Sequence, residues 1–240
     1  VECREQALPG VGRQVGLHQC EGHRQLVVAR HLRQPRQLAF HLAVVRGHLE
    51  DAVAASEKEV GRANIIRAYQ ELDFGGKARM FRMNGLDTHF AYQDLVQIIE
   101  AAGDNIDLVV VPKVNRPEDI YFVETLLTQI ESYKQFERPI GIEALIETAL
   151  GCVNIKEIVA CSTRLEGVVY GPGDYAASVQ MPLESIGEMD ENDALYPGHR
   201  WHHVMHSLVS AARAFQKRVV DGPFAGIKNP EGLILSLIHI

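Results

Sequence analysis

Short apolar runs alternate with longer segments of helical periodicity from Leu49 to about Phe224. Strands are predicted at residues 78–84, 106–111, 140–146, 165–170 and 218–222, with a sixth ending at Leu49. Helices are predicted to begin at Ser56 and to cover residues 88–102, 117–133, 155–160 and 200–215. Because each strand is followed by a helix, the pattern predicts parallel βαβ units and an α/β fold.

The first predicted helix has a capping box in Ser56-Glu57-Lys58-Glu59, where Ser56 and Glu59 would satisfy free amides of the first turn. Its predicted buried face consists of Val60, Ala63, Ile66 and Tyr69. Residues 171–198 are rich in glycine and proline and are predicted to form loops.

Two sheet architectures fit the alternation, a doubly wound open sheet and a TIM (β/α)8 barrel. Polar residues follow nearly every predicted strand: Glu50 and Asp51, Arg82 and Asn84, Lys113, Glu147, Asp174, and Asp221. In a barrel all strand ends converge on one face, whereas in an open sheet only the strands at the switch point meet. The distribution therefore favours an incomplete TIM barrel.

Both ends of the chain differ from this pattern. No lysine precedes Lys58 and no aspartate precedes Asp51, while arginine, glutamine and histidine crowd the first residues. We interpret residues 1–48 as an unreliable segment from a frameshift or misjoin, with a natural basic extension as the alternative. Residues 235–240 match the translation of a sequencing adapter. The predicted organisation is an N-terminal segment 1–48, a partial barrel 49–232 and an adapter-derived tail 233–240.

Charge and composition exclude several classes of protein. The net charge of −7 argues against nucleic acid or an anionic membrane as the partner. No apolar run approaches the roughly 20 residues that span a bilayer, and no signal-peptide pattern is present. The four cysteines, Cys3, Cys20, Cys152 and Cys161, have neither metal-site spacing nor the number of a disulfide scaffold. These features predict a cytoplasmic protein.

Two carboxylates, Glu147 and Asp174, follow successive predicted strands. Hard oxygen ligands, few in number, suit Mg²⁺ with water and substrate completing its shell. Gly171 and Gly173 would leave backbone amides open to a ligand. For either carboxylate alone, helix capping or solvation of a strand end is an equally good explanation.

Arg82 lies in an otherwise apolar strand and needs an anionic partner, because its charge cannot be removed. That partner is either Glu50 or Asp51 in an internal ion pair, or a substrate carboxylate or oxyanion, and the sequence leaves the two open. Lys113 could form a Schiff base, but an electrostatic or packing role is favoured beside a metal and an arginine.

Several motifs occur in a diagnostic order: residues 49–53 (LEDAV), 81–85 (FRMNG), 111–114 (VPKV), 146–149 (IETA), 171–178 (GPGDYAAS) and 221–224 (DGPF). Taken jointly they resemble the citrate-lyase beta-subunit-like family. Residues 196–198 (YPG), leading into Trp201, resemble its malyl-CoA lyase branch in particular. The resemblance covers residues 49 to 232.

This resemblance implies a TIM barrel that binds Mg²⁺, with Mn²⁺ as the alternative ion, through Glu147 and Asp174. It implies reversible cleavage of a malyl-CoA-type thioester into acetyl-CoA or propionyl-CoA and glyoxylate, in a homo-oligomer, trimeric or hexameric. Arg82, Glu50 and Asp51 would be the catalytic residues. The implied substrate-binding residues are Arg82, Asn84, Gly173, Asp174, Asp221 and Gly222.

The chain also departs from the family pattern. Residues 1–48 do not match the first strand that helps to bind CoA, and the last strand and a C-terminal lid with a catalytic acid would lie beyond Ile240. We therefore expect the chain as written to be impaired or inactive. The alternatives are a metal-dependent pyruvate-type aldolase, a malyl-CoA thioesterase, and a truncated chain without activity.

Overall fold

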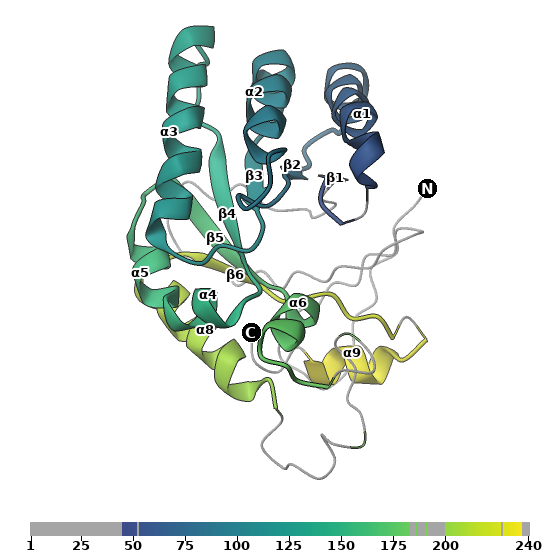
Figure 1. Cartoon of the computed structure of the whole chain (residues 1–240), viewed down its shortest axis with the longest axis vertical. Helices are drawn as coiled ribbons and strands as arrows, with labels where there is room; N and C mark the ends of the chain where they lie inside the picture. The colour runs from purple at the N-terminus through teal and green to yellow at the C-terminus, as the bar shows by residue number, and fades with distance from the viewer. Residues whose placement is uncertain are drawn as a thin grey trace.

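A parallel β-sheet forms the centre of the computed structural model, which describes residues 45–51, 53–182, 186, 191, 200–226 and 228–236 (Figure 1). Its strands run in the order β1-β2-β3-β4-β5-β6, each parallel to the next. They comprise β1 (Val45–His48), β2 (Arg79–Arg82), β3 (Leu108–Val111), β4 (Gly141–Ile146), β5 (Leu165–Tyr170) and β6 (Arg218–Val220).

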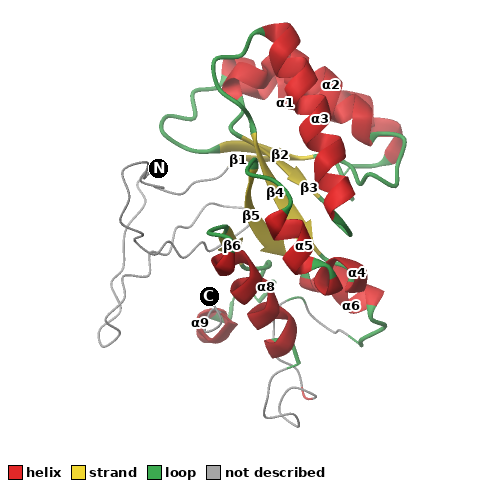
Figure 2. Cartoon of the chain, turned by 90° about the vertical axis from the view of Figure 1, so that its left-hand side faces the viewer, coloured by secondary structure: helices red, strands yellow, loops and turns green. Residues whose placement is uncertain are grey.

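Helices connect the strands. The long helices α1, α2 and α3 lie side by side over the first strands, and α5 and α8 cover the later ones (Figures 1 and 2). The helices are α1 (Lys58–Glu71), α2 (Ala91–Ala102), α3 (Pro117–Lys134), α4 (Ala149–Val153), α5 (Ile155–Ala160), α6 (Pro172–Ser178), α8 (His202–Ala214) and α9 (Pro230–Ser236). No described helix combines the length and apolar composition that a membrane crossing requires.

The strand order decides between the two predicted architectures. A doubly wound sheet reverses its order at a switch point, whereas here every strand is hydrogen-bonded to the next one in sequence. The prediction of an α/β fold with barrel-type winding is therefore confirmed. Among the described residues β1 and β6 each pair on one side only, so this part of the sheet is open between them.

Every residue of β3 and β4 is buried, so both faces of these central strands are covered, which explains the continuous apolar run of β3. Strand β4 includes the buried Glu143, and β5 is buried except at Glu166. The face under the helices includes Phe81, Val109, Ile142 and Val168. Alternate residues form a smaller cluster on the inner face: Met80, Leu108, Val110, Leu145 and Val169. This alternation continues past the strand ends and decides which polar side chains point inward.

Helix α1 differs from its prediction. Ser56 lies in a short 3-10 turn, Ala55–Glu57, and α1 begins at Lys58 without a side-chain cap, so the predicted capping box is wrong. The predicted buried face is wrong at Val60 and Ala63, which are exposed, whereas Ile66 is partly buried and packs against the core. The buried residues are Lys58, Arg62, Ile65 and Tyr69, of which only Tyr69 was predicted. The two cations can be buried because polar groups of other elements bind them.

Other differences concern the loops and the ends. Helix α6 lies in the stretch predicted to be loops, with Pro172 in its first turn. Strand β1 begins at Val45, before the predicted domain boundary, and α9 continues into the predicted tail. Residues 1–44 and 237–240 lie outside the described residues, so the predicted organisation of both ends stays a prediction.

Candidate active site

Charged side chains gather at the carboxyl ends of β1 to β5. Arg82 follows Met80 by two residues and Glu147 follows Leu145 by two, so both continue the inward-facing alternation of their strands. Glu50 likewise follows the end of β1 by two residues. Parallel strands bring their carboxyl ends to one edge of a sheet, and they therefore deliver these side chains to a common place.

Glu50 lies between two cations. Its Oε2 is 3.3 Å from Arg82 Nε and its Oε1 is 3.2 Å from Lys113 Nζ, while its side chain is only 6% exposed. None of these three buried atoms, Glu50 Oε1, Glu50 Oε2 and Arg82 Nε, makes a hydrogen bond among the described residues. Burial raises the pKa of Glu50, although the charges of Arg82 and Lys113 oppose this. Of the two kinds of partner that the sequence left open for Arg82, the structure thus shows the internal ion pair, with Glu50.

Lys113 connects Glu50 to Glu147. Its φ of 51° lies in the left-handed region, which is uncommon for a residue other than glycine. In this conformation its main-chain N–H donates to Glu147 Oε1 at 2.9 Å, while its ammonium approaches Glu50. Burial lowers the pKa of Lys113, but the contact with Glu50 and the charges of Asp51 and Asp174 together outweigh burial and raise it overall. An ammonium held charged suits an electrostatic role better than Schiff-base formation.

Glu147 is the most perturbed carboxyl group of the site. It is 3% exposed, and burial, followed by the charges of Glu50 and Asp174, raises its pKa to about 8. Gly171 makes room for it, since a Cβ there would lie 2.6 Å from Glu147 Oε2. Such a shift, caused by burial together with neighbouring charges, is typical of functional sites.

Asp174 joins this group from α6, where it occupies the first turn. The Gly171 N–H donates to the Ile146 carbonyl at 3.0 Å, and the Ala149 N–H donates to Ser178 Oγ at 3.0 Å. These bonds fix α6 against the end of β4. As a result, the charge of Asp174 contributes to the raised pKa values of both Glu147 and Lys113.

The donor set fits a hard divalent cation. Among the described residues no three His, Cys, Asp or Glu side chains could hold a metal ion by themselves. Mg²⁺ does not require such a cage, because it is usually bound through one or two carboxylates and keeps water or substrate as further ligands. A cation would relieve the repulsion by which Glu50 and Asp174 help to raise the pKa of buried Glu147, so these carboxylates fit Mg²⁺.

The remaining predicted site residues lie in different surroundings. Asp51 is exposed, and its charge raises the pKa of Glu50. Burial raises the pKa of Asp221 to about 6, and Asp221 Oδ1 accepts the Gly222 N–H at 2.7 Å. Gly173 lies in the first turn of α6. The side chain of Asn84 is engaged at both ends by Lys58 and Asp94. The binding roles predicted for these residues stay predictions.

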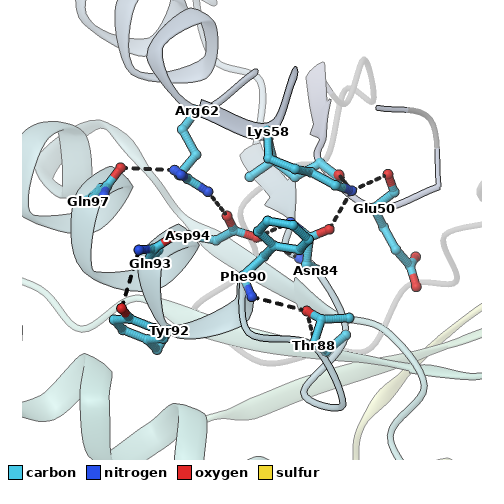
Figure 3. A network of polar contacts seen from close by, with 12 residues as sticks. Glu50, Lys58, Arg62, Asn84, Thr88, Phe90, Tyr92, Gln93, Asp94 and Gln97 are labelled. Carbon is cyan, nitrogen blue, oxygen red and sulfur yellow. Dashed lines mark hydrogen bonds and ion pairs between the residues drawn. The ribbon is translucent and has the colours of Figure 1, made fainter. Parts of the chain in front are cut away.

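Sequence reasoning missed a buried polar network beside the site, formed by Lys58, Arg62, Asn84 and Asp94 (Figure 3). A pattern in the sequence could have revealed this network. Lys58, Arg62, Ile65 and Tyr69 recur at helical spacing, and two cations on one stripe with apolar residues indicate buried partners.

A protein-family profile described as HpcH/HpaI aldolase/citrate lyase matches residues 44–238. The L-malyl-CoA/beta-methylmalyl-CoA lyase of Cereibacter sphaeroides is 40% identical over 195 residues, which cover 79% of this chain and 61% of the relative. The malyl-CoA/beta-methylmalyl-CoA/citramalyl-CoA lyase of Chloroflexus aurantiacus is 35% identical over 206 residues, covering 80% of this chain and 59% of the relative. The chain thus spans about three fifths of the length of these curated relatives.

Among solved structures, the citrate lyase beta subunit of M. tuberculosis, complexed with oxaloacetate and magnesium, superposes with a TM-score of 0.60 at 25% sequence identity. The superposition covers 79% of this chain and 73% of that one.

Proposed function

Because the chain belongs to the HpcH/HpaI aldolase/citrate lyase family, we propose that its activity is the reversible, Mg²⁺-dependent cleavage of a malyl-CoA-type thioester into an acyl-CoA and glyoxylate. One observation carries the proposal. Glu50, Arg82, Lys113, Glu147 and Asp174 converge at the carboxyl edge of the sheet. The malyl-CoA lyase names of the curated relatives support the substrate class.

Glu147 and Asp174 would hold the metal ion, as two carboxylates of different elements. Mg²⁺, when bound, would act as a Lewis acid on the aldehyde oxygen and the adjacent carboxylate of glyoxylate. The magnesium bound by the citrate lyase beta subunit of M. tuberculosis supports this choice of ion. The main-chain N–H of Lys113 orients Glu147 by donating to one of its oxygens, which leaves the other oxygen for the ion.

The reaction places negative charge on the acyl-CoA fragment. When the carbon–carbon bond breaks, its electron pair passes to the α-carbon of the thioester, forming an enolate that must then be protonated. The hydroxyl carbon becomes the aldehyde carbon of glyoxylate as the hydroxyl group gives up its proton to a general base. The α-carbon takes up one proton, so the protons balance. The guanidinium of Arg82 would stabilise the enolate oxygen. Glu50 would hold Arg82 and Lys113 at the site through its two ion pairs.

Incubation of the chain with malyl-CoA, with and without Mg²⁺, tests the proposal. The rate should be low, because residues 1–48 do not match the strand that helps to bind CoA. We expect equal amounts of acetyl-CoA and glyoxylate, measured by chromatography and as the phenylhydrazone, only when Mg²⁺ is present. Glu147→Gln and Asp174→Asn should each abolish this turnover, because they remove a metal ligand while preserving side-chain shape. Glu157→Gln is the matched control, since Glu157 is exposed on α5.

Three outcomes would contradict the proposal. Undiminished turnover in Glu147→Gln or Asp174→Asn would contradict the metal assignment. Free CoA without glyoxylate would identify a thioesterase instead. Binding and turnover of free pyruvate without a CoA thioester would identify a pyruvate-type aldolase.

A further inference from the structure

We propose that Lys58 is a positioning residue that fixes Glu50, and through Glu50 the charged cluster of the candidate active site. Lys58 lies at the start of α1 and is separated from the cluster by the main chain of residues 49 and 50 (Figure 3). The inference rests on the proposed function, because it assigns Glu50 a task in that reaction.

The ammonium of Lys58 uses all three of its donors. It donates to the Leu49 carbonyl at 2.5 Å, to the Glu50 carbonyl at 2.9 Å and to Asn84 Oδ1 at 2.6 Å. The residue is 7% exposed, and the ammonium lies 5.6 Å from the centroid of the Phe90 ring. Two consecutive carbonyls on one ammonium fix the orientation of the Leu49–Glu50 peptide.

A second layer holds Asn84 in place. Asp94 Oδ2 accepts from the main-chain N–H of Asn84 at 2.8 Å and from its side-chain amide at 2.5 Å. Arg62 Nη1 donates to Asp94 Oδ1 at 3.0 Å, and Arg62 Nε donates to Gln97 at 2.9 Å. Asp94 is fully buried. The acceptor that Asn84 offers to Lys58 is therefore held by α1 and α2 together.

The main-chain carbonyl and the carboxylate of Glu50 have different partners. Its carbonyl accepts from Lys58 and also from the Val53 N–H at 3.0 Å, so its main chain is held on the helix side. Its carboxylate points away from the ammonium of Lys58 (Figure 3). The two carboxylate oxygens pair with Arg82 and Lys113. Lys58 makes no direct ion pair with Glu50 in this arrangement. It sets where the carboxylate is, and thereby where Arg82 and Lys113 are held beside Glu147.

Lys58→Met tests this assignment, because methionine keeps the length of the side chain and removes all three donors. Hydrogen exchange followed by mass spectrometry should show at least about tenfold faster exchange in residues 47–53, where the Val53 amide is bonded to Glu50. The Mn²⁺ affinity, measured by electron paramagnetic resonance on the whole chain, should fall about 10-fold, at the low end for lost supporting contacts.

Arg164→Met is the matched control. Arg164 forms an ion pair with Glu131 at 2.6 Å, just before the amino end of β5 and thus at the opposite edge of the sheet. It should lower the melting temperature while leaving the exchange of residues 47–53 and the Mn²⁺ affinity unchanged. Asn84→Ala provides a second variant that removes one acceptor of Lys58, and it should shift both readouts in the same direction by a smaller factor.

The outcomes separate this inference from the proposed function. Wild-type exchange rates in residues 47–53 of folded Lys58→Met would overturn it. Faster exchange with unchanged Mn²⁺ affinity would also overturn it, because Lys58 would then be merely structural. If the wild-type chain fails to cleave malyl-CoA, the proposed function is wrong, whereas the exchange and Mn²⁺ measurements still decide the role of Lys58.

Discussion

Gly171→Ala probes the space that the fold reserves for the Glu147 carboxylate. An added Cβ would lie 2.5 Å from Glu147 Cβ and 2.6 Å from Glu147 Oε2, where ordinary contact begins at 3.4 Å. The overlap is thus about 0.8–0.9 Å. The backbone itself tolerates alanine, because φ at Gly171 is −111°. The substitution should therefore act through the displacement of Glu147 rather than through strain in the loop.

The structure sets the expected magnitude. A misplacement of about 1 Å can cost on the order of 100-fold in rate, which corresponds to about 2.8 kcal/mol. Overpacking should cost about 1–3 kcal/mol of stability, or a fall in Tm of roughly 2–4 °C for each kcal/mol in a chain of this size. The loss of turnover should thus exceed anything that partial unfolding at the assay temperature can explain.

Steady-state turnover of malyl-CoA and calorimetric titration with Mg²⁺ measure the effect, and a thermal melt checks folding. Gly76→Ala is the control, because a Cβ at Gly76 meets nothing within 4 Å. If folded Gly171→Ala retains wild-type turnover and Mg²⁺ affinity, then the position of Glu147 does not matter and the reasoning is refuted.

Three further predictions concern stability and reactivity. Burial raises the pKa of Asp221 to about 6. The protonated carboxyl group therefore contributes to stability below its ordinary pKa of 3.8, and this contribution is lost as the pH rises through 6. Asp221→Asn should have a higher Tm than the wild type at pH 7.5 but not at pH 4, and equal Tm values at both pH values would contradict this. Arg164→Met leaves the partly buried Glu131 without its cationic partner and should cost about 3 kcal/mol, or on the order of 6–12 °C in Tm. A Tm within 1–2 °C of wild type, on the order of a surface substitution, would be inconsistent with this. Burial raises the pKa of the Cys152 and Cys161 thiols to about 12 and about 11, so peptide mapping at pH 8 should find them alkylated only after unfolding, and rapid labelling of the native chain would argue against their burial.

The buried strands could be predicted from the sequence because their apolar runs need no partner of special chemistry. Strand β5 comprises Leu165–Tyr170, as predicted, and β4 comprises Gly141–Ile146, one residue shorter than predicted. Short helices were harder to predict from the sequence than the buried strands. The seven residues of α6 contain proline and glycine, and its stability comes from packing and from bonds such as that between Ala149 and Ser178.

The buried face of helix α1 could not be predicted correctly from apolar periodicity alone. Apolar spacing favoured Val60, Ala63 and Ile66 as the buried face, yet the structure buries Lys58 and Arg62 instead. Their burial depends on acceptors from the end of β1 and on Asp94 of α2, which only the tertiary arrangement supplies.

The candidate site, too, could be predicted from the sequence only in part. Strand-end positions sufficed to predict that Glu50, Arg82, Glu147 and Asp174 meet, because parallel strands share one edge. The sequence did not reveal that Lys113 adopts a positive φ and donates its N–H to Glu147. Nor did it reveal that the amide of Asn84 is engaged by Lys58 and Asp94. Both depend on backbone geometry at the strand ends rather than on residue type.

The central proposal is that Glu147 and Asp174 together bind one divalent cation. Calorimetric titration of Mg²⁺ into the wild-type chain, Glu147→Gln and Asp174→Asn measures this directly. We predict one binding event per chain in the wild type and none in either variant at the same concentrations. Wild-type affinity in both variants would contradict the central claim.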